Sequence, residues 1–219
     1  MIRKLYLSGL AALGLAISSQ ATPVLVVWDN AGHVQTINDN QVGDSASGSG
    51  QIVWVGSMGV WTLDVSVGVT GGTTNQPILD LSGSSTSSSA GILNVWYGDN
   101  NFGPSIGSLL ATIGGTLSTG ASLEYRADYN TANDPIGSSV ILMDNTYTGN
   151  PFSGSDSSSI NQNGPFALVQ HVILTHTGAG TSSYDAMLSV PEASSTAILM
   201  GFGLIGLGLV KRRNKASRA

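Results

Sequence analysis

The stretch Trp61–Val69, WTLDVSVGV, decides the fold class. Apolar side chains occupy every second position of this stretch, and threonine, aspartate, serine and glycine stand between them. Successive side chains of a β-strand point to opposite faces, so a period of two predicts a strand with one buried and one solvated face. Leu123–Tyr129, LEYRADY, repeats the pattern and predicts that Arg126 lies on a polar face among carboxylates.

Similar short segments fill residues 22–189, separated by turns rich in Gly, Ser, Asn and Asp, and no helical period interrupts them. This pattern predicts one all-β domain of two packed antiparallel sheets, a sandwich of jelly-roll or immunoglobulin-like type. The serine-rich stretches Ser84–Ser89 and Ser153–Ser159 are predicted to be flexible loops. The other predicted strands are Val24–Trp28, His33–Ile37, Ile52–Val55, Ile78–Leu81, Gly91–Tyr97, Leu109–Ile113, Ser139–Met143, Phe166–Thr177 and Tyr184–Val190.

The charges are distributed very unevenly along the chain. Between residues 22 and 189 there are twelve acidic side chains and a single basic one, Arg126, whereas most lysines and arginines lie at the two ends. Such a negative domain repels phosphate backbones, which excludes nucleic acid as a partner. The chain has no cysteine, which also excludes disulfide scaffolds, thiolate metal sites and cysteine nucleophiles.

The N-terminus, MIRKLYLSGLAALGLAISSQA, has the pattern of a signal peptide. Arg3 and Lys4 precede an apolar stretch, and the small residues Ser19 and Ala21 stand at the −3 and −1 positions of a cleavage site. We therefore predict export, with residues 1–21 removed after Ala21.

The C-terminus, VPEASSTAILMGFGLIGLGLVKRRNKASRA, begins at Val190. Its uncharged run Thr196–Val210 can enter a bilayer, and the basic cluster that follows would hold its end in the cytoplasm. The run is somewhat short for a permanent anchor, which needs about 20 apolar residues. Residues 190–219 are thus predicted to be a tail with a transmembrane helix. The basic cluster consists of Lys211, Arg212 and Arg213.

This tail resembles the PEP-CTERM sorting signal, in which a Pro-Glu-Pro motif precedes a glycine- and leucine-rich membrane segment and a basic end. The matching motif here is Val190-Pro191-Glu192, with Ala193 in place of the second proline. The resemblance implies export, processing near the motif by an exosortase, and release to or retention at the surface of a bacterium that makes extracellular polysaccharide. An ordinary single-pass anchor is the alternative.

The domain itself, with GSMGVWTLDV from Gly56 and GPFALVQHVILTHTGAGTSSYDAMLSV from Gly164, resembles a group of exosortase-sorted proteins; that resemblance implies no activity.

One short motif permits a hydrolase hypothesis. Gly103–Gly107, GPSIG, fits the G-x-S-x-G nucleophile elbow around Ser105, and His171 and His176 follow it. A true elbow joins a strand to a helix in an α/β sheet, whereas Ser105 belongs to a loop of an all-β chain. The two histidines are five residues apart on one strand, so they are predicted to point to opposite faces. We therefore predict no catalytic site.

Asn and Asp gather in three segments, Asn38–Asp44, Asp99–Asn101 and Asp128–Asp134. Oxygen-rich loops suit Ca²⁺, but none of the three has the twelve-residue EF-hand spacing. Turns built on Asn and Asp side chains are the simpler interpretation. We expect no cofactor and keep calcium as the alternative.

Trp96 is the best candidate for an exposed ring, because its parity differs from that of the apolar Leu93, Val95 and Tyr97. Trp61, by contrast, has the parity of the core. An exposed ring is typical of glycan contacts. The sequence therefore predicts a non-catalytic protein of the cell surface or extracellular matrix, with a carbohydrate-binding module as the alternative and extracellular polysaccharide as its partner.

Overall fold

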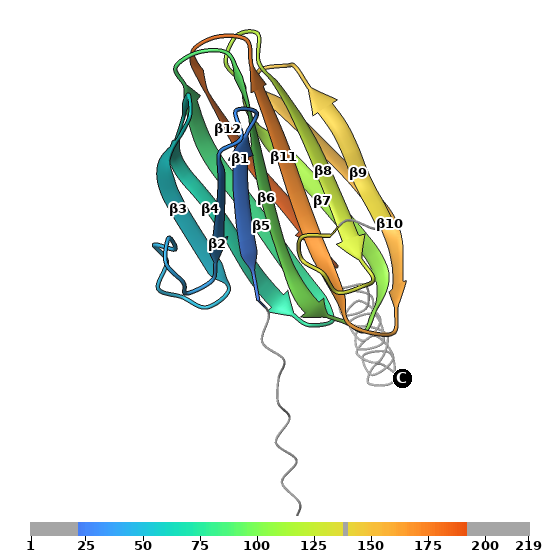
Figure 1. Cartoon of the computed structure of the whole chain (residues 1–219). Helices are drawn as coiled ribbons and strands as arrows, with labels where there is room; N and C mark the ends of the chain where they lie inside the picture. The colour runs from blue at the N-terminus through green and yellow to red at the C-terminus, as the bar shows by residue number, and fades with distance from the viewer. Residues whose placement is uncertain (1–21, 138–139, 192–219) are drawn as a thin grey trace, which may run out of the picture.

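The structure, a computed structural model, describes residues 22–137 and 140–191, except for the side chains of residues 64–66. Within this range, twelve strands form two antiparallel six-stranded sheets packed face to face (Figure 1), which confirms the predicted all-β sandwich. The strands are β1 (Val24–Asp29), β2 (Val34–Asn38), β3 (Gln51–Met58), β4 (Trp61–Thr73), β5 (Gln76–Ser87), β6 (Gly91–Phe102), β7 (Ser105–Thr116), β8 (Ser122–Asn130), β9 (Val140–Tyr147), β10 (Phe152–Gln162), β11 (Phe166–His176) and β12 (Gly180–Ser189).

The strand order follows from a set of nested antiparallel pairs. β8 pairs with β9, β7 with β10, β6 with β11, and β5 with β12. Sheet A has the order β2-β1-β6-β11-β8-β9, and sheet B has the order β10-β7-β12-β5-β4-β3. The last two strands of the domain, β11 and β12, therefore each lie in the interior of a sheet. Sheet A is the nearer one in Figure 1.

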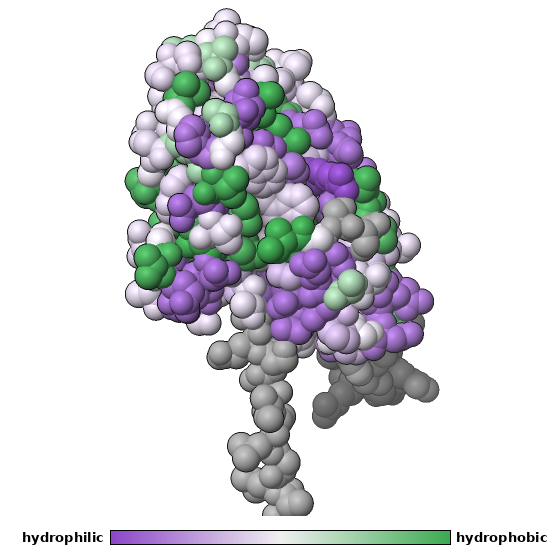
Figure 2. Space-filling view, in the orientation of Figure 1, coloured by the Kyte–Doolittle hydropathy of each residue, from purple (hydrophilic) through white to green (hydrophobic). Residues whose placement is uncertain are grey.

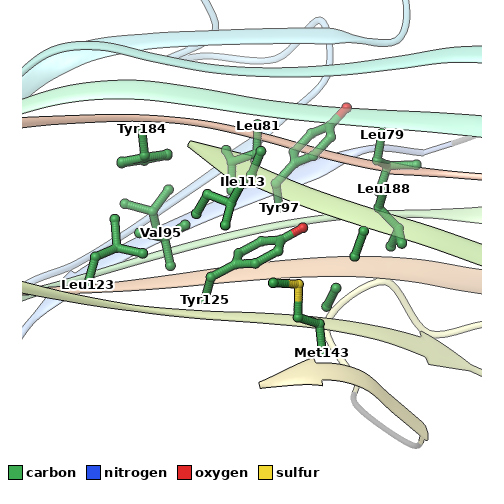
Figure 3. Packing of buried hydrophobic residues seen from close by; sticks show 14 of the residues in the cluster. Leu79, Leu81, Val95, Tyr97, Ile113, Leu123, Tyr125, Met143, Tyr184 and Leu188 are labelled. Atoms are coloured by element: carbon green, nitrogen blue, oxygen red, sulfur yellow. The ribbon is translucent and has the colours of Figure 1, made fainter. Parts of the chain in front are cut away.

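The space between the sheets is filled by the inward-facing half of each strand. Trp61, Tyr97, Tyr125 and Phe166 are the largest fully buried side chains. Figure 3 shows the rings of Tyr97 and Tyr125 among aliphatic side chains such as Leu79 and Leu188. Because the hydrophobic cluster extends from Leu25 to Val190, residues 22–191 contain a complete core and should fold as a unit.

A buried polar bridge connects the two sheets. The Tyr125 hydroxyl donates to Oε1 of Gln170 at 2.7 Å, and Nε2 of Gln170 donates to the carbonyl of Leu79 at 3.0 Å. The burial of these polar groups is tolerated because both are hydrogen-bonded.

The prediction of flexible loops at Ser84–Ser89 and Ser153–Ser159 is wrong. Ser84–Ser87 ends strand β5 between β4 and β12, and the second stretch lies within the edge strand β10. Buried Phe152 and Ile160 fix the two ends of β10 in the core, so the serines between them complete a ladder with β7. Serine composition alone does not show this, since the anchoring residues lie at the ends of the run.

The sandwich ends one residue later than predicted. Val190 is only 6% exposed, and its N–H donates to the Pro77 carbonyl at 3.1 Å, whereas Pro191 is exposed. The signal peptide (1–21) and the tail from Glu192, with Lys211, Arg212 and Arg213, lie outside the described residues. In the part that is described, the structure has no helix long and apolar enough to cross a membrane.

Candidate functional site

Three rings from neighbouring strands meet on the outer face of sheet A. Trp28 comes from β1, Trp96 from β6 and His171 from β11, and each is partly exposed. The ring centroids are 6.4 Å apart for the two tryptophans, 5.3 Å for Trp28 and His171, and 5.0 Å for Trp96 and His171. We call these three residues the aromatic cluster. Its mutual contacts fix the rings on a rigid sheet, since such pairs are stabilising at these distances.

Hydrogen bonds hold two of the rings in place. Nε1 of Trp96 donates to the carbonyl of Pro135 at 3.2 Å, and His171 bonds through Nε2 to Oδ1 of Asn94 at 3.2 Å. Pro135 belongs to the loop after β8, which crosses the face directly over Gly98. A Cβ at Gly98 would collide with the Pro135 carbonyl, so glycine is required there for the loop to reach Trp96.

The one basic side chain of residues 22–189 lies next to the aromatic cluster. Arg126 in β8 is registered opposite His171, and its Nε contacts both carboxylate oxygens of Asp128, at 3.1 and 2.9 Å. The Asp128 side chain is almost fully buried, whereas that of Arg126 is 31% exposed. On its other side Arg126 is registered with exposed Asp144. The guanidinium is therefore oriented at the border of the cluster.

The aromatic cluster carries no charge at neutral pH. Burial, with a smaller contribution from the positive charge of Arg126, lowers the pKa of His171 to about 4. Figure 2, which looks onto sheet A, shows near-neutral and hydrophobic side chains in the middle of this face and hydrophilic ones around them. Flat, uncharged rings with a polar border can stack on the apolar face of a sugar ring while polar groups contact its hydroxyls.

Acid is expected to destabilise the domain through His171. The unfolded histidine titrates near pH 6.5, so between about pH 6.5 and 4 the unfolded state binds more protons and the free energy of unfolding falls as the pH falls. The slope from this group is at most about 1.4 kcal/mol per pH unit. Buried Asp99, whose pKa is raised to about 6, contributes a slope of opposite sign over part of this range.

The measurement is urea unfolding of wild type and His171→Gln at several values between pH 7 and 4.5. The difference in unfolding free energy between the two should change in favour of the variant as the pH falls. Parallel pH profiles would contradict the assignment, and a constant offset from lost ring contacts would not affect the slope.

The structure does not join Ser105 to a histidine. Ser105 is 3% exposed and donates its hydroxyl to the carbonyl of Asn75 at 2.8 Å. His171 faces outward, while His176 is buried on the inner face, which confirms that they point to opposite sides. The pattern around Ser105 is thus the start of strand β7, and the nucleophile–base contact of a hydrolase elbow does not form.

His176 is part of a satisfied hydrogen-bond chain. The Ser87 hydroxyl donates to the Gly178 carbonyl, so Nδ1–H of His176 donates to Ser87 Oγ at 2.7 Å. Nε2 accepts from Ser182 Oγ at 2.8 Å, and the ring stacks on Trp61 at 4.7 Å. Burial lowers the pKa of His176, in keeping with a neutral structural histidine.

The polar loops form turns of the expected kind. Oδ1 of Asp44 accepts from Ala46 N–H, and Oδ1 of Asn130 accepts from Ala132 N–H, which are contacts of Asx turns. His33 bonds to Oδ2 of Asp29 at 2.8 Å and its side chain is 56% exposed. No group of three or more His, Asp or Glu side chains suited to a metal occurs among the residues described.

Sequence reasoning found Trp96 but missed its partners. The parity of Trp96 is confirmed, since the ring lies on the outer face with Asn94. Trp28 was missed because VLVVW is apolar at every position, so its alternation cannot be read. The contact with His171 depends on strand order, which the local pattern does not contain.

The fold defines the class: an all-β protein whose two antiparallel sheets pack as a sandwich. No family model and no curated protein matches the chain. Among solved structures, it is similar to a carbohydrate-binding module from a study of promiscuous specificity in the β-sandwich superfamily, with 16% identity over 78% of this chain and 74% of the other, and a TM-score of 0.34.

A mutant of a carbohydrate-binding module of family 29 matches at 10% identity over 78% of this chain and 96% of its own, with a TM-score of 0.24. YcfD, a ribosomal oxygenase from Escherichia coli, matches at 10% identity over 89% of this chain and 46% of its own, also with a TM-score of 0.24. At such TM-scores these similarities do not bear on function.

Proposed function

We propose that this chain is an exported, non-catalytic protein of the cell surface or extracellular matrix whose sandwich binds polysaccharide. The observation that carries the proposal is the aromatic cluster of Trp28, Trp96 and His171. Large rings are ordinarily buried, and three that remain partly exposed and in mutual contact on a rigid sheet indicate a binding surface. Trp96 is the residue for which the sequence already suggested a glycan contact.

Charge indicates the class of polysaccharide. The cluster is neutral, and the domain around it has twelve acidic side chains against one Arg126. A strongly acidic glycan would be repelled by this excess of carboxylates, so the proposed ligand is a neutral polysaccharide. The nested strand pairs β5–β12 support the jelly-roll type in preference to the immunoglobulin-like one, and we propose that assignment as well.

Affinity electrophoresis of residues 22–191 in gels that contain different polysaccharides tests the function. At least one neutral polysaccharide should retard the protein, and titration with soluble oligosaccharides of that type should change the fluorescence of the clustered tryptophans. If no gel retards the protein and no sugar changes the fluorescence, the binding function is rejected and only the matrix role is left.

We further propose that the tail from Val190 is a sorting signal cleaved by an exosortase-type enzyme near Pro191 and Glu192. The resemblance to PEP-CTERM tails supports this, as does the basic cluster Lys211–Arg213 after an uncharged run. Mass spectrometry of the mature protein from its host should find a C-terminus near Pro191. An intact C-terminus at Ala219 would instead show a permanent anchor.

A further inference from the structure

Two carboxylates that are 60 residues apart in the sequence lie in one row at the end of sheet A where β1 begins. The backbone N–H of Asp39 donates to the carbonyl of Pro23 at 3.3 Å. Pro23 precedes Val24, which is paired with Gly98, so Pro23 lies beside Asp99 in β6. Asp39, Pro23 and Asp99 therefore lie side by side across the sheet, and by strand parity both carboxylates are on the inner face.

Sheet B closes this end with oxygen-bearing groups. The Gly50 N–H donates to Oδ2 of Asp39 at 2.9 Å, and the Thr70 N–H donates to the Gly50 carbonyl at 2.7 Å. The Thr70 hydroxyl bonds to the Tyr97 hydroxyl at 2.8 Å, and the Thr70 side chain also interacts with the Asp99 carboxyl. This chain of contacts brings Asp39, Asp99 and Thr70 together.

Each carboxylate has a buried oxygen that nothing in the described protein satisfies. Asp99 has no exposed surface, and its Oδ2 makes no hydrogen bond; Oδ1 of Asp39 is also buried and has no partner. Buried carboxylate oxygens are ordinarily hydrogen-bonded or bound to a metal. Burial, with a smaller contribution from Asp39, raises the pKa of Asp99 to about 6, as expected for a carboxyl whose counter-charge is missing.

We propose that Oδ1 of Asp39, Oδ2 of Asp99 and the Thr70 hydroxyl bind one Ca²⁺. All three ligands are oxygens, which suits a hard cation, and two carboxylates balance its charge. Ca²⁺ tolerates irregular geometry and completes its shell with water, whereas Mg²⁺ demands a near-ideal octahedron. The ion would connect the loop after β2 to β4 and β6. Since the site has only two carboxylates, it does not form a cluster of three acidic groups.

Calorimetric titration of EDTA-treated residues 22–191 with CaCl₂ tests the site. One Ca²⁺ per chain should bind with a Kd in the micromolar to millimolar range, and Mg²⁺ should bind more weakly. Bound Tb³⁺ should luminesce on excitation of the neighbouring Tyr97. Asp99→Asn and Asp39→Asn should each weaken Ca²⁺ binding at least about tenfold, since each removes one charged ligand. Asp156→Asn, on the exposed edge strand β10, removes the same charge elsewhere and should bind as wild type does.

Absence of saturable Ca²⁺ binding, or equal binding by wild type and the Asp39→Asn variant, would overturn the proposal. Should Asp99→Asn fail to fold, Asp39→Asn decides, because Asp39 lies in a loop that is only half-buried. The site is distinct from the aromatic cluster, so polysaccharide binding measured in EDTA keeps the two proposals separate.

Discussion

The double variant Trp28→Ala/Trp96→Ala is expected to bind polysaccharide roughly tenfold to a hundredfold more weakly than wild type. Each ring stacked on a sugar contributes about 0.5–1.5 kcal/mol beyond its buried area, and about 1.4 kcal/mol corresponds to a tenfold change in Kd. Both side chains lie on the outer face of sheet A, so the core should remain intact. The measurement is the Kd for the polysaccharide selected by affinity electrophoresis.

Trp54→Ala is the matched control for this variant. Trp54 is also a partly buried tryptophan, but it belongs to β3 in sheet B, far along the strand order from the aromatic cluster. Its replacement should leave polysaccharide binding unchanged. If Trp54→Ala weakens binding as much as the double variant does, the outer face of sheet A is not the binding surface.

Trp61→Ala is expected to destabilise the domain by about 3–5 kcal/mol, the usual cost of truncating a fully buried tryptophan. Trp61 is 1% exposed and its ring supports that of His176. Domains of this kind are stable by only about 5–15 kcal/mol, so much of the protein's stability would be lost. Urea unfolding followed by circular dichroism measures the change.

Trp61→Phe separates ring packing from hydrogen bonding. Nε1 of Trp61 is buried and has no hydrogen-bond partner in the described protein, so phenylalanine sacrifices no hydrogen bond and keeps a ring against His176. Its cost should be well below that of alanine. Equal losses for the two variants would show that packing against His176 is not what Trp61 contributes.

The parts of the fold that depend on alternation could be predicted from sequence. Trp61 is in the core and Trp96 on the outer face because their neighbours alternate in polarity. Strand β10 could not be predicted, since its interior is almost entirely serine, glycine and asparagine and only Phe152 and Ile160 enter the core. Flexible composition and edge-strand composition are the same when the partner strand is unknown.

Both candidate sites depend on which strands become neighbours. Trp28, Trp96 and His171 meet only because β1, β6 and β11 are adjacent in sheet A. The likely turn residues Asp39 and Asp99 were singled out from composition, but their approach across Pro23 requires the same strand order. Strand order is set by pairing between distant segments, and the local period of a single sequence does not specify it.

The interior positions of β11 and β12 have a consequence for when the domain can fold. β11 separates β6 from β8, and β12 separates β5 from β7, so a chain that has emerged only to residue 165 leaves a gap in each sheet. Contacts such as Thr86 to Thr181, 95 residues apart, form only after the last strand is available. Closing such long loops makes folding slow. The nascent domain therefore stays unfolded until its final strand has been synthesised, a state in which it can still be threaded through a narrow export channel.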